Sequence, residues 1–143
     1  MGDDRLLLRI ANDVAELSRV AETVDVYCDE TGIPTDVAFK INVVLEELLM
    51  NTISYGFTDG KPHEIAVTID RHDETVTIEI DDDGVAFDPL QAPPPDLDAP
   101  IEERQIGGLG IHFVKTMMDT VEYRRADGRN HMTLTKRIVP DAD

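Results

Sequence analysis

Glu47 and Asn51 are the first pair of side chains in this sequence that could do chemistry together. They lie four positions apart in an apolar run with helical spacing, so they share one face of the predicted helix. An amide oxygen suits Mg²⁺, which takes few protein ligands and keeps phosphates and waters. A carboxylate one turn away could orient or deprotonate an attacking hydroxyl. The pair alone also fits a polar stripe on a solvated helix.

An acidic turn at residues 81–84 follows a predicted strand. The alternation of Ile78 and Ile80 places Asp82 on the inward face of that strand. A buried carboxylate there would accept a hydrogen bond from an exocyclic amine, and would therefore select adenine over guanine. The alternative is a purely structural turn, because Asp and Gly both favour turns.

A glycine-rich turn at residues 107–110 opens a predicted helix. Glycines let backbone N–H groups approach an anion, and a helix N-terminus adds about half a positive charge. The segment lacks the lysine of a P-loop and does not have the spacing of a dinucleotide-binding turn. Phosphate contact and a merely flexible turn are therefore both open at this point.

Periodicity predicts the elements that position these residues. We expect strands over 6–10, 65–69, 76–80, 120–125 and 131–139, and helices over 14–31, 35–55 and about 108–118. This order predicts an α/β (α+β) two-layer sandwich, in which about three helices cover one face of a mixed, mainly antiparallel sheet.

Composition limits the class of protein. The 143 residues predict a single domain, 1–143, and the net charge of −17 disfavours direct binding to nucleic acid. No apolar run is long enough to span a membrane and the N-terminus has no signal-peptide pattern, so we expect a cytoplasmic protein. The proline-rich, acidic stretch at 88–106 is interpreted as a lid loop.

Taken together, these segments resemble the GHKL ATP-binding family, and within it the bacterial anti-sigma-factor serine kinases, whose domain is like the ATP-binding domain of histidine kinases. Residues 47–56 (ELLMNTISYG) resemble the family's N box, and 82–89 (DDGVAFDP) its first glycine box. Residues 107–119, which begin GGLGI, resemble the second, and 130–136 (NHMTLTK) the closing strand. The resemblance spans nearly the whole chain.

The resemblance implies a role for individual residues. Asn51 would hold Mg²⁺, Asp82 would bind adenine, the glycines would contact phosphate and Glu47 would be the general base. The residues that the resemblance places around ATP are Asn51, Tyr55, Asp82, Gly84, Ala86, Phe87, Gly107, Gly108, Leu109, Gly110, Ile111 and Thr133.

The function implied is that of an ATP- and Mg²⁺-dependent serine kinase that sequesters a sigma factor and phosphorylates an anti-anti-sigma (STAS-type) partner. A homodimer is compatible with this interpretation. One position departs from the family: Ile106 stands where an arginine often reaches the γ-phosphate, and this bears on phosphoryl transfer more than on ATP binding. The alternatives are a non-catalytic, ATP-gated protein-binding module and an interaction domain that has lost nucleotide binding.

Overall fold

The computed structural model describes residues 5–86, 88 and 108–138, with the backbone alone at 108–111. Its elements are β1 (Arg5–Ala11), the 3₁₀ helix η1 (Val14–Glu16), α1 (Leu17–Thr31), α2 (Thr35–Tyr55), β2 (Glu64–His72), β3 (Thr75–Asp82), α3 (Gly108–Met117), β4 (Thr120–Ala126) and β5 (Arg129–Arg137). The expected lid loop at 88–106 lies, apart from Asp88, outside the described residues.

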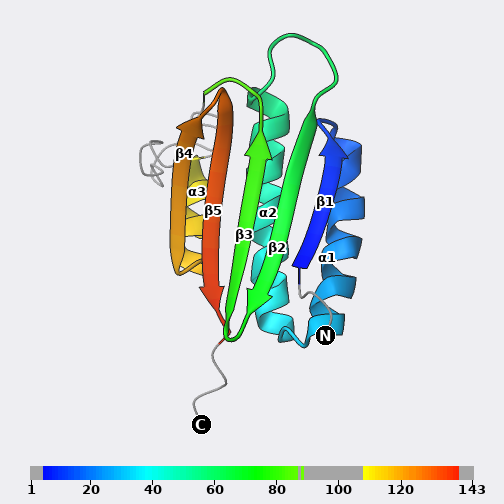
Figure 1. The fold of residues 1–143 in the computed structure, drawn as a ribbon, viewed down its shortest axis with the longest axis vertical. Helices are drawn as coiled ribbons and strands as arrows, with labels where there is room; N and C mark the ends of the chain where they lie inside the picture. The colour runs from blue at the N-terminus through cyan, green and yellow to red at the C-terminus, as the bar shows by residue number, and fades with distance from the viewer. Residues whose placement is uncertain (1–4, 87, 89–107, 139–143) are drawn as a thin grey trace.

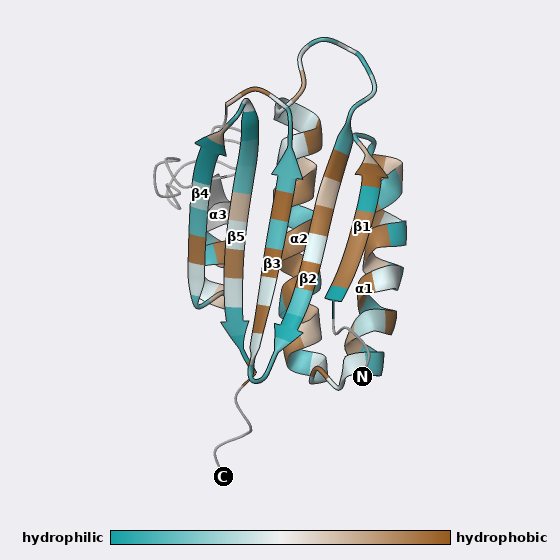
Figure 2. Ribbon diagram, viewed as in Figure 1, coloured by the Kyte–Doolittle hydropathy of each residue, from teal (hydrophilic) through white to brown (hydrophobic). Residues whose placement is uncertain are grey.

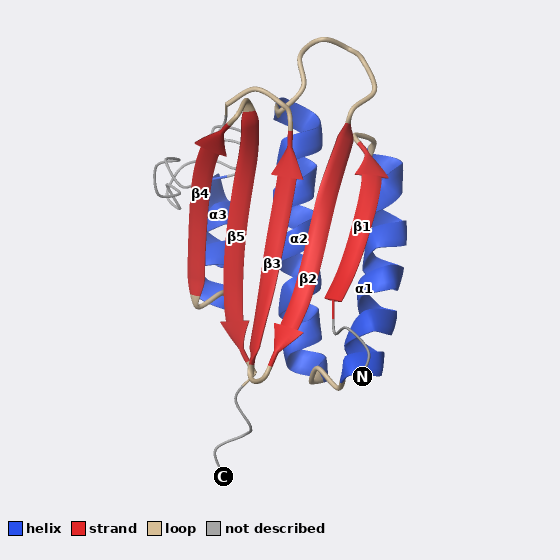
Figure 3. Cartoon of the chain, in the orientation of Figure 1, coloured by secondary structure: helices blue, strands red, loops and turns tan. Residues whose placement is uncertain are grey.

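The described strands form one five-stranded sheet in the order β1-β2-β3-β5-β4, and the three α-helices lie behind one face of it (Figure 1, Figure 3). The predicted α+β two-layer sandwich is confirmed. Every pairing among these strands is antiparallel, so the sheet is not mixed. Two α-helices lie between β1 and β2, so the chain reverses direction three times and β2 returns beside β1 in the opposite direction.

Alternation along the strands builds the core. Ile65, Val67 and Ile69 of β2 are fully buried against the helices, while the residues between them are more exposed. The same alternation of apolar and polar residues is visible along β3 in Figure 2. Helix α2 supplies the facing layer with a stripe of buried residues: Val37, Ile41, Val44, Leu45, Leu48 and Leu49. Each large aliphatic side chain buried in this way contributes about 1.5–3 kcal/mol.

The ends of α1 follow local rules. The expected helix over 14–31 divides into η1 and α1, and the side chain of Asp13 caps η1 by accepting from Ala15 N. Gly32 closes α1 with a φ of 74°, the left-handed conformation that glycine adopts without strain. Helix α2 has the predicted bounds, Thr35–Tyr55.

Cys28 lies buried in α1. Burial, with a smaller effect from the Asp25 carboxylate, raises the pKa of its thiol to about 11. The thiol is therefore protonated at neutral pH and packs as a small apolar group. Within the part of the chain that the structure describes, no helix has the length and apolarity needed to cross a membrane.

Removing the buried Leu45 side chain should destabilise the domain. Leu45 in α2 is fully buried, and we expect Leu45→Ala to lower the free energy of unfolding by about 2–5 kcal/mol, because a cavity replaces close packing. The matched control is Leu7→Ala, since Leu7 on β1 is 52% exposed. Urea denaturation monitored by circular dichroism measures both, and an equal loss in the two variants would contradict this packing.

Candidate functional site

Asp82, at the end of β3, is the buried carboxylate at the centre of the site. It is only 4% exposed, and its Oδ1 accepts hydrogen bonds from Gly84 N (2.8 Å) and Asn130 Nδ2 (3.0 Å). No described residue donates to Oδ2. The expected inward placement of Asp82 is therefore confirmed, and one oxygen of the carboxylate is left for a donor in the adjoining pocket.

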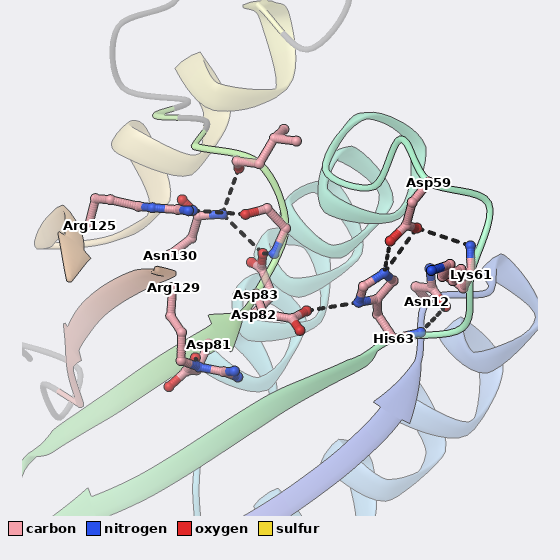
Figure 4. Close-up of polar contacts among 12 residues, drawn as sticks. Asn12, Asp59, Lys61, His63, Asp81, Asp82, Asp83, Arg125, Arg129 and Asn130 are labelled. Atoms are coloured by element: carbon pink, nitrogen blue, oxygen red, sulfur yellow. Dashed lines mark hydrogen bonds and ion pairs between the residues drawn. The ribbon is translucent and has the colours of Figure 1, made fainter. Parts of the chain in front are cut away.

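Two residues that the sequence did not single out complete this network. Asn130 of β5 is 6% exposed and donates through Nδ2 to Val85 O (2.8 Å) as well as to Asp82 (Figure 4). Its Oδ1 accepts from the hydroxyl of Tyr123 on β4 (2.5 Å). Asn130 lies directly opposite Asp82 in the β3–β5 register, so the signal that could have found it is the pairing of these two strands.

Glu47 and Asn51 share one face of α2, as their spacing predicts. Asn51 is 7% exposed, and its Nδ2 donates to Glu47 Oε2 at 2.9 Å. This bond uses the NH₂ end of the amide, and no described residue donates to Asn51 Oδ1 or to Glu47 Oε1. A carbonyl oxygen and a carboxylate oxygen are thus both available next to each other.

A single pocket brings Asn51 of α2 and Asp82 of the acidic turn together. Its lining combines apolar side chains with a few polar groups: Leu48, Asn51, Thr52, Gly56, Ile80, Asp82, Tyr123, Asn130 and Met132. A mainly apolar hollow with a few convergent polar groups is the usual form of a small-molecule site. Asn51 and Asp82 come from different layers of the sandwich, so only the packing of α2 on the sheet makes them neighbours.

The turn after β3 requires a glycine at position 84. A Cβ on Gly84 would lie 2.3 Å from Gly56 O and 2.9 Å from Asp82 Oδ1. The close approach is held by Val85 N, which donates to Gly56 O at 2.7 Å, and by Arg125 Nη1, which donates to Gly84 O at 2.8 Å. The end of α2 and the end of β3 are therefore joined through backbone atoms.

Thr133, which the resemblance places near the nucleotide, does not line this pocket. Asn130, Met132 and Leu134 of β5 are buried toward the helices, so Thr133 faces the opposite side of the sheet, where its paired residues are Glu79 and Glu122.

The other residues that the resemblance placed around ATP are distributed as follows. Tyr55 is 42% exposed and Ala86 is exposed, and neither lines the pocket. Gly108, Leu109, Gly110 and Ile111 lie in the first turn of α3, while Phe87 and Gly107 are outside the described residues.

His63 joins the two loops at the rim of the site. Its Nδ1 lies 3.0 Å from Asp83 Oδ1 and its Nε2 lies 2.9 Å from Asp59 Oδ2 (Figure 4). The His63 ring also stacks on Phe57. The hydrogen bond to Asp59 is the main cause that raises the pKa of His63, and Asp83 adds to it. The hydrogen bond from the Lys61 N–H is the main cause that lowers the pKa of Asp59, and the hydrogen bond from His63 adds to it. The imidazolium form can donate to both carboxylates at once.

Comparison with known proteins agrees with this fold. Residues 10–136 match the model of the histidine kinase-like ATPase domain. The serine/threonine-protein kinase BtrW of Bordetella bronchiseptica is 36% identical over 104 residues, which cover 73% of each chain. The serine-protein kinase RsbW of Bacillus cereus is 22% identical over 139 residues, which cover 94% of this chain and 86% of RsbW.

A solved structure described as the RsbU and RsbW domains of Rv1364c from Mycobacterium tuberculosis superposes with a TM-score of 0.65 at 15% sequence identity. It covers 94% of this chain, which spans 32% of that longer chain, and the likeness shows the fold alone. The antiparallel α+β sandwich, with a mainly apolar pocket between α2 and the sheet, is consistent with an ATPase type of domain. The chain belongs to the histidine kinase-like ATPase domain family.

The stabilisation from His63 should depend on pH. Because the folded-state pKa of His63 is raised, its contribution to the free energy of unfolding is fully present below a pH of about 6.5. This contribution is lost as the pH rises through the folded-state pKa. We expect the difference in unfolding free energy between wild type and His63→Gln to be larger at pH 6 than at pH 9. His63 lines a surface hollow together with Asp59, Asp83 and Arg125, so these are the charged side chains that face it there.

Urea denaturation across this pH range measures the difference. His72→Gln is the matched control, because the His72 side chain is 90% exposed and lies 3.8 Å from the equally exposed carboxylate of its neighbour Asp73. If the difference in unfolding free energy between wild type and His63→Gln stays constant with pH, the assigned protonation of His63 is contradicted.

Proposed function

We propose that this domain binds ATP with Mg²⁺ and transfers the γ-phosphate to a serine of an anti-anti-sigma (STAS-type) protein, and that it sequesters a sigma factor. The proposal is supported by relatives named serine-protein kinases and by membership of the histidine kinase-like ATPase family. The observation that carries it is the single pocket that joins Asn51 of α2 to the buried Asp82 of β3.

The pocket has the groups needed to hold an adenine base. Leu48, Ile80 and Met132 supply apolar walls, and Asp82 presents an acceptor oxygen to which no described residue donates. The exocyclic amine of adenine is a donor, whereas guanine presents a carbonyl oxygen on the corresponding edge. Two acceptors facing each other would be unfavourable, so this pocket should prefer adenine.

Asn51 fits the cation that accompanies ATP. Its NH₂ group is used by Glu47, which leaves the neutral carbonyl Oδ1 as the available end. Mg²⁺ is commonly held by one or two protein oxygens, with phosphates and waters completing its coordination. When bound, Mg²⁺ would neutralise phosphate charge during the transfer. Among the described residues there is no cluster of three or more His, Cys, Asp or Glu side chains that could hold a metal.

Glu47 is the group that we assign as base. Its Oε2 is anchored by Asn51, and no described residue donates to Oε1. In the proposed step, Oε1 takes the proton of the partner's serine hydroxyl as the serine oxygen bonds to the γ-phosphorus. The bond from that phosphorus to the β–γ bridging oxygen breaks, and ADP leaves with this electron pair.

A second candidate is a non-catalytic, ATP-gated protein-binding module. The observation that favours it is Ile106, which stands where the resembling kinases often carry an arginine for the γ-phosphate. In this case nucleotide occupancy alone would change the affinity for the protein partner, and Glu47 would serve only to hold Asn51. Turnover distinguishes the two candidates.

ATP binding should require Mg²⁺ and exceed GTP binding. Calorimetric titration with ATP and with GTP, each with and without Mg²⁺, measures this directly. The physical reason is the acceptor at Asp82 and the amide oxygen of Asn51 in one pocket. Equal affinity for ATP and GTP would remove the role assigned to Asp82, and absence of ATP binding would exclude both candidate functions.

Glu47→Gln should slow phosphoryl transfer while ATP affinity changes little. The amide keeps the shape and the hydrogen-bonding capacity of Glu47 but cannot accept the proton, so the rate should fall by about 10²–10⁴-fold. Asn51→Ala should instead abolish the Mg²⁺-dependent binding of ATP itself. The assays are ATP affinity and phosphate transfer to a partner protein captured from the native cell.

Glu46→Gln is the matched control, because Glu46 is adjacent in sequence but exposed and rotated by about 100° around the helix. Transfer by Glu47→Gln at the wild-type rate would show that Glu47 is not the base. A wild type that binds ATP but transfers no phosphate to any captured partner would favour the ATP-gated module.

A further inference from the structure

The side chains of Tyr123, Asn130 and Asp82 form a continuous chain of hydrogen bonds along one wall of the pocket. The Tyr123 hydroxyl donates to Asn130 Oδ1 at 2.5 Å, and Asn130 Nδ2 donates to Asp82 Oδ1 at 3.0 Å and to Val85 O at 2.8 Å. Asn130 and Asp82 are buried, Tyr123 is half-buried, and all three line the pocket. The chain therefore runs from β4 through β5 to β3.

These partners determine the orientation of the Asn130 amide. The NH₂ end faces a carboxylate and a backbone carbonyl, and both of these only accept hydrogen bonds. The oxygen end faces a hydroxyl that donates. If the amide were reversed, its oxygen would face two acceptors and its NH₂ group would face the Tyr123 hydroxyl. The observed orientation is therefore strongly favoured, and Tyr123 contributes to it.

The orientation of Asn130 in turn determines how Asp82 meets the pocket. Two donors, Gly84 N and Asn130 Nδ2, are directed at Oδ1, while no described residue donates to Oδ2. A carboxylate held at one oxygen by two donors cannot rotate about its bond to Cβ without breaking both hydrogen bonds. Oδ2 is thereby kept as a fixed acceptor.

We propose that Asn130 and Tyr123 are positioning residues that hold Asp82 as a fixed acceptor and so determine the preference of the pocket for adenine over guanine. This inference rests on the proposed ATP site. Without Asn130, the Gly84 N–H is the one donor to Asp82 that remains among the described residues, and the carboxylate can rotate. A carboxylate that is free to rotate discriminates less between a base that presents an amine and one that presents a carbonyl oxygen.

The test is the ratio of ATP to GTP affinity, measured by calorimetry with Mg²⁺, in the wild type and in a set of variants. We expect Asn130→Ala to lower this ratio by about 10-fold, the size of effect that loss of a hydrogen bond to a charged group produces. Tyr123→Phe deletes one oxygen and should lower the ratio less, in the same direction. Asp82→Ala should also lower it.

The double variant Asp82→Ala/Asn130→Ala separates positioning from a general structural role. If Asn130 acts through Asp82, the double variant should have the same ratio of ATP to GTP affinity as Asp82→Ala alone. A further fall of equal size in the double variant would overturn the proposal. So would an unchanged ratio in Asn130→Ala, with its fold verified by circular dichroism.

The matched control is Asn42→Ala. Asn42 of α2 makes a chemically similar contact, from its Nδ2 to Asp25 Oδ1 at 2.8 Å, but lies outside the pocket, so the ratio should not change. If Asn130→Ala does not fold, Tyr123→Phe decides the question, and an unchanged ratio in that variant overturns the proposal. A wild type that binds ATP and GTP equally overturns this inference together with the role of Asp82, whereas failure of the wild type to bind ATP overturns the proposed function itself.

Discussion

The site depends on the burial of one carboxylate at the end of a strand. Asp82 is 4% exposed, and a charge withdrawn from water in this way must receive hydrogen bonds to remain stable. The local turn supplies one donor, Gly84 N, and the neighbouring strand supplies the other, Asn130 Nδ2. Each of these two donors constrains the structure around Asp82. Position 84 must lack a Cβ, and β5 must pair with β3 in the register that places Asn130 opposite Asp82. A turn that served only to reverse the chain would need neither.

Helix α2 connects this constraint to the core. One of its faces buries Leu45 and Leu48 against the sheet, and the same face, one turn later, presents Asn51 to the pocket. The helix cannot rotate without exposing its apolar stripe, so packing energy holds Asn51 in place. Groups carried on rigid elements keep their geometry better than groups on loops, which is what a site for a metal-bound phosphate requires.

The rim of the pocket is held by groups from three separate parts of the chain. Val85 N binds Gly56 O, Arg125 binds Gly84 O, and His63 lies between Asp59 and Asp83. These contacts join the loop after α2, the turn after β3 and strand β4. In a chain with a net charge of −17, a protonated His63 also separates two carboxylates that would otherwise repel each other. The rim is therefore electrostatically stabilised, whereas the pocket walls are mainly apolar.

Local periodicity determined most of the fold from the sequence alone. The bounds of α2, the one-turn spacing of Glu47 and Asn51, and the inward direction of Asp82 are properties of a helix or strand by itself, so they could be predicted. The alternation of Met132 and Leu134 also places Thr133 outward, although the family resemblance had assigned it to the nucleotide. Only the tertiary structure decided that Asn130 lies opposite Asp82, 48 residues away in sequence, and that Tyr123 completes the chain of hydrogen bonds. Strand order and register depend on how the whole sheet packs against its helices, and no local pattern of side chains contains that information.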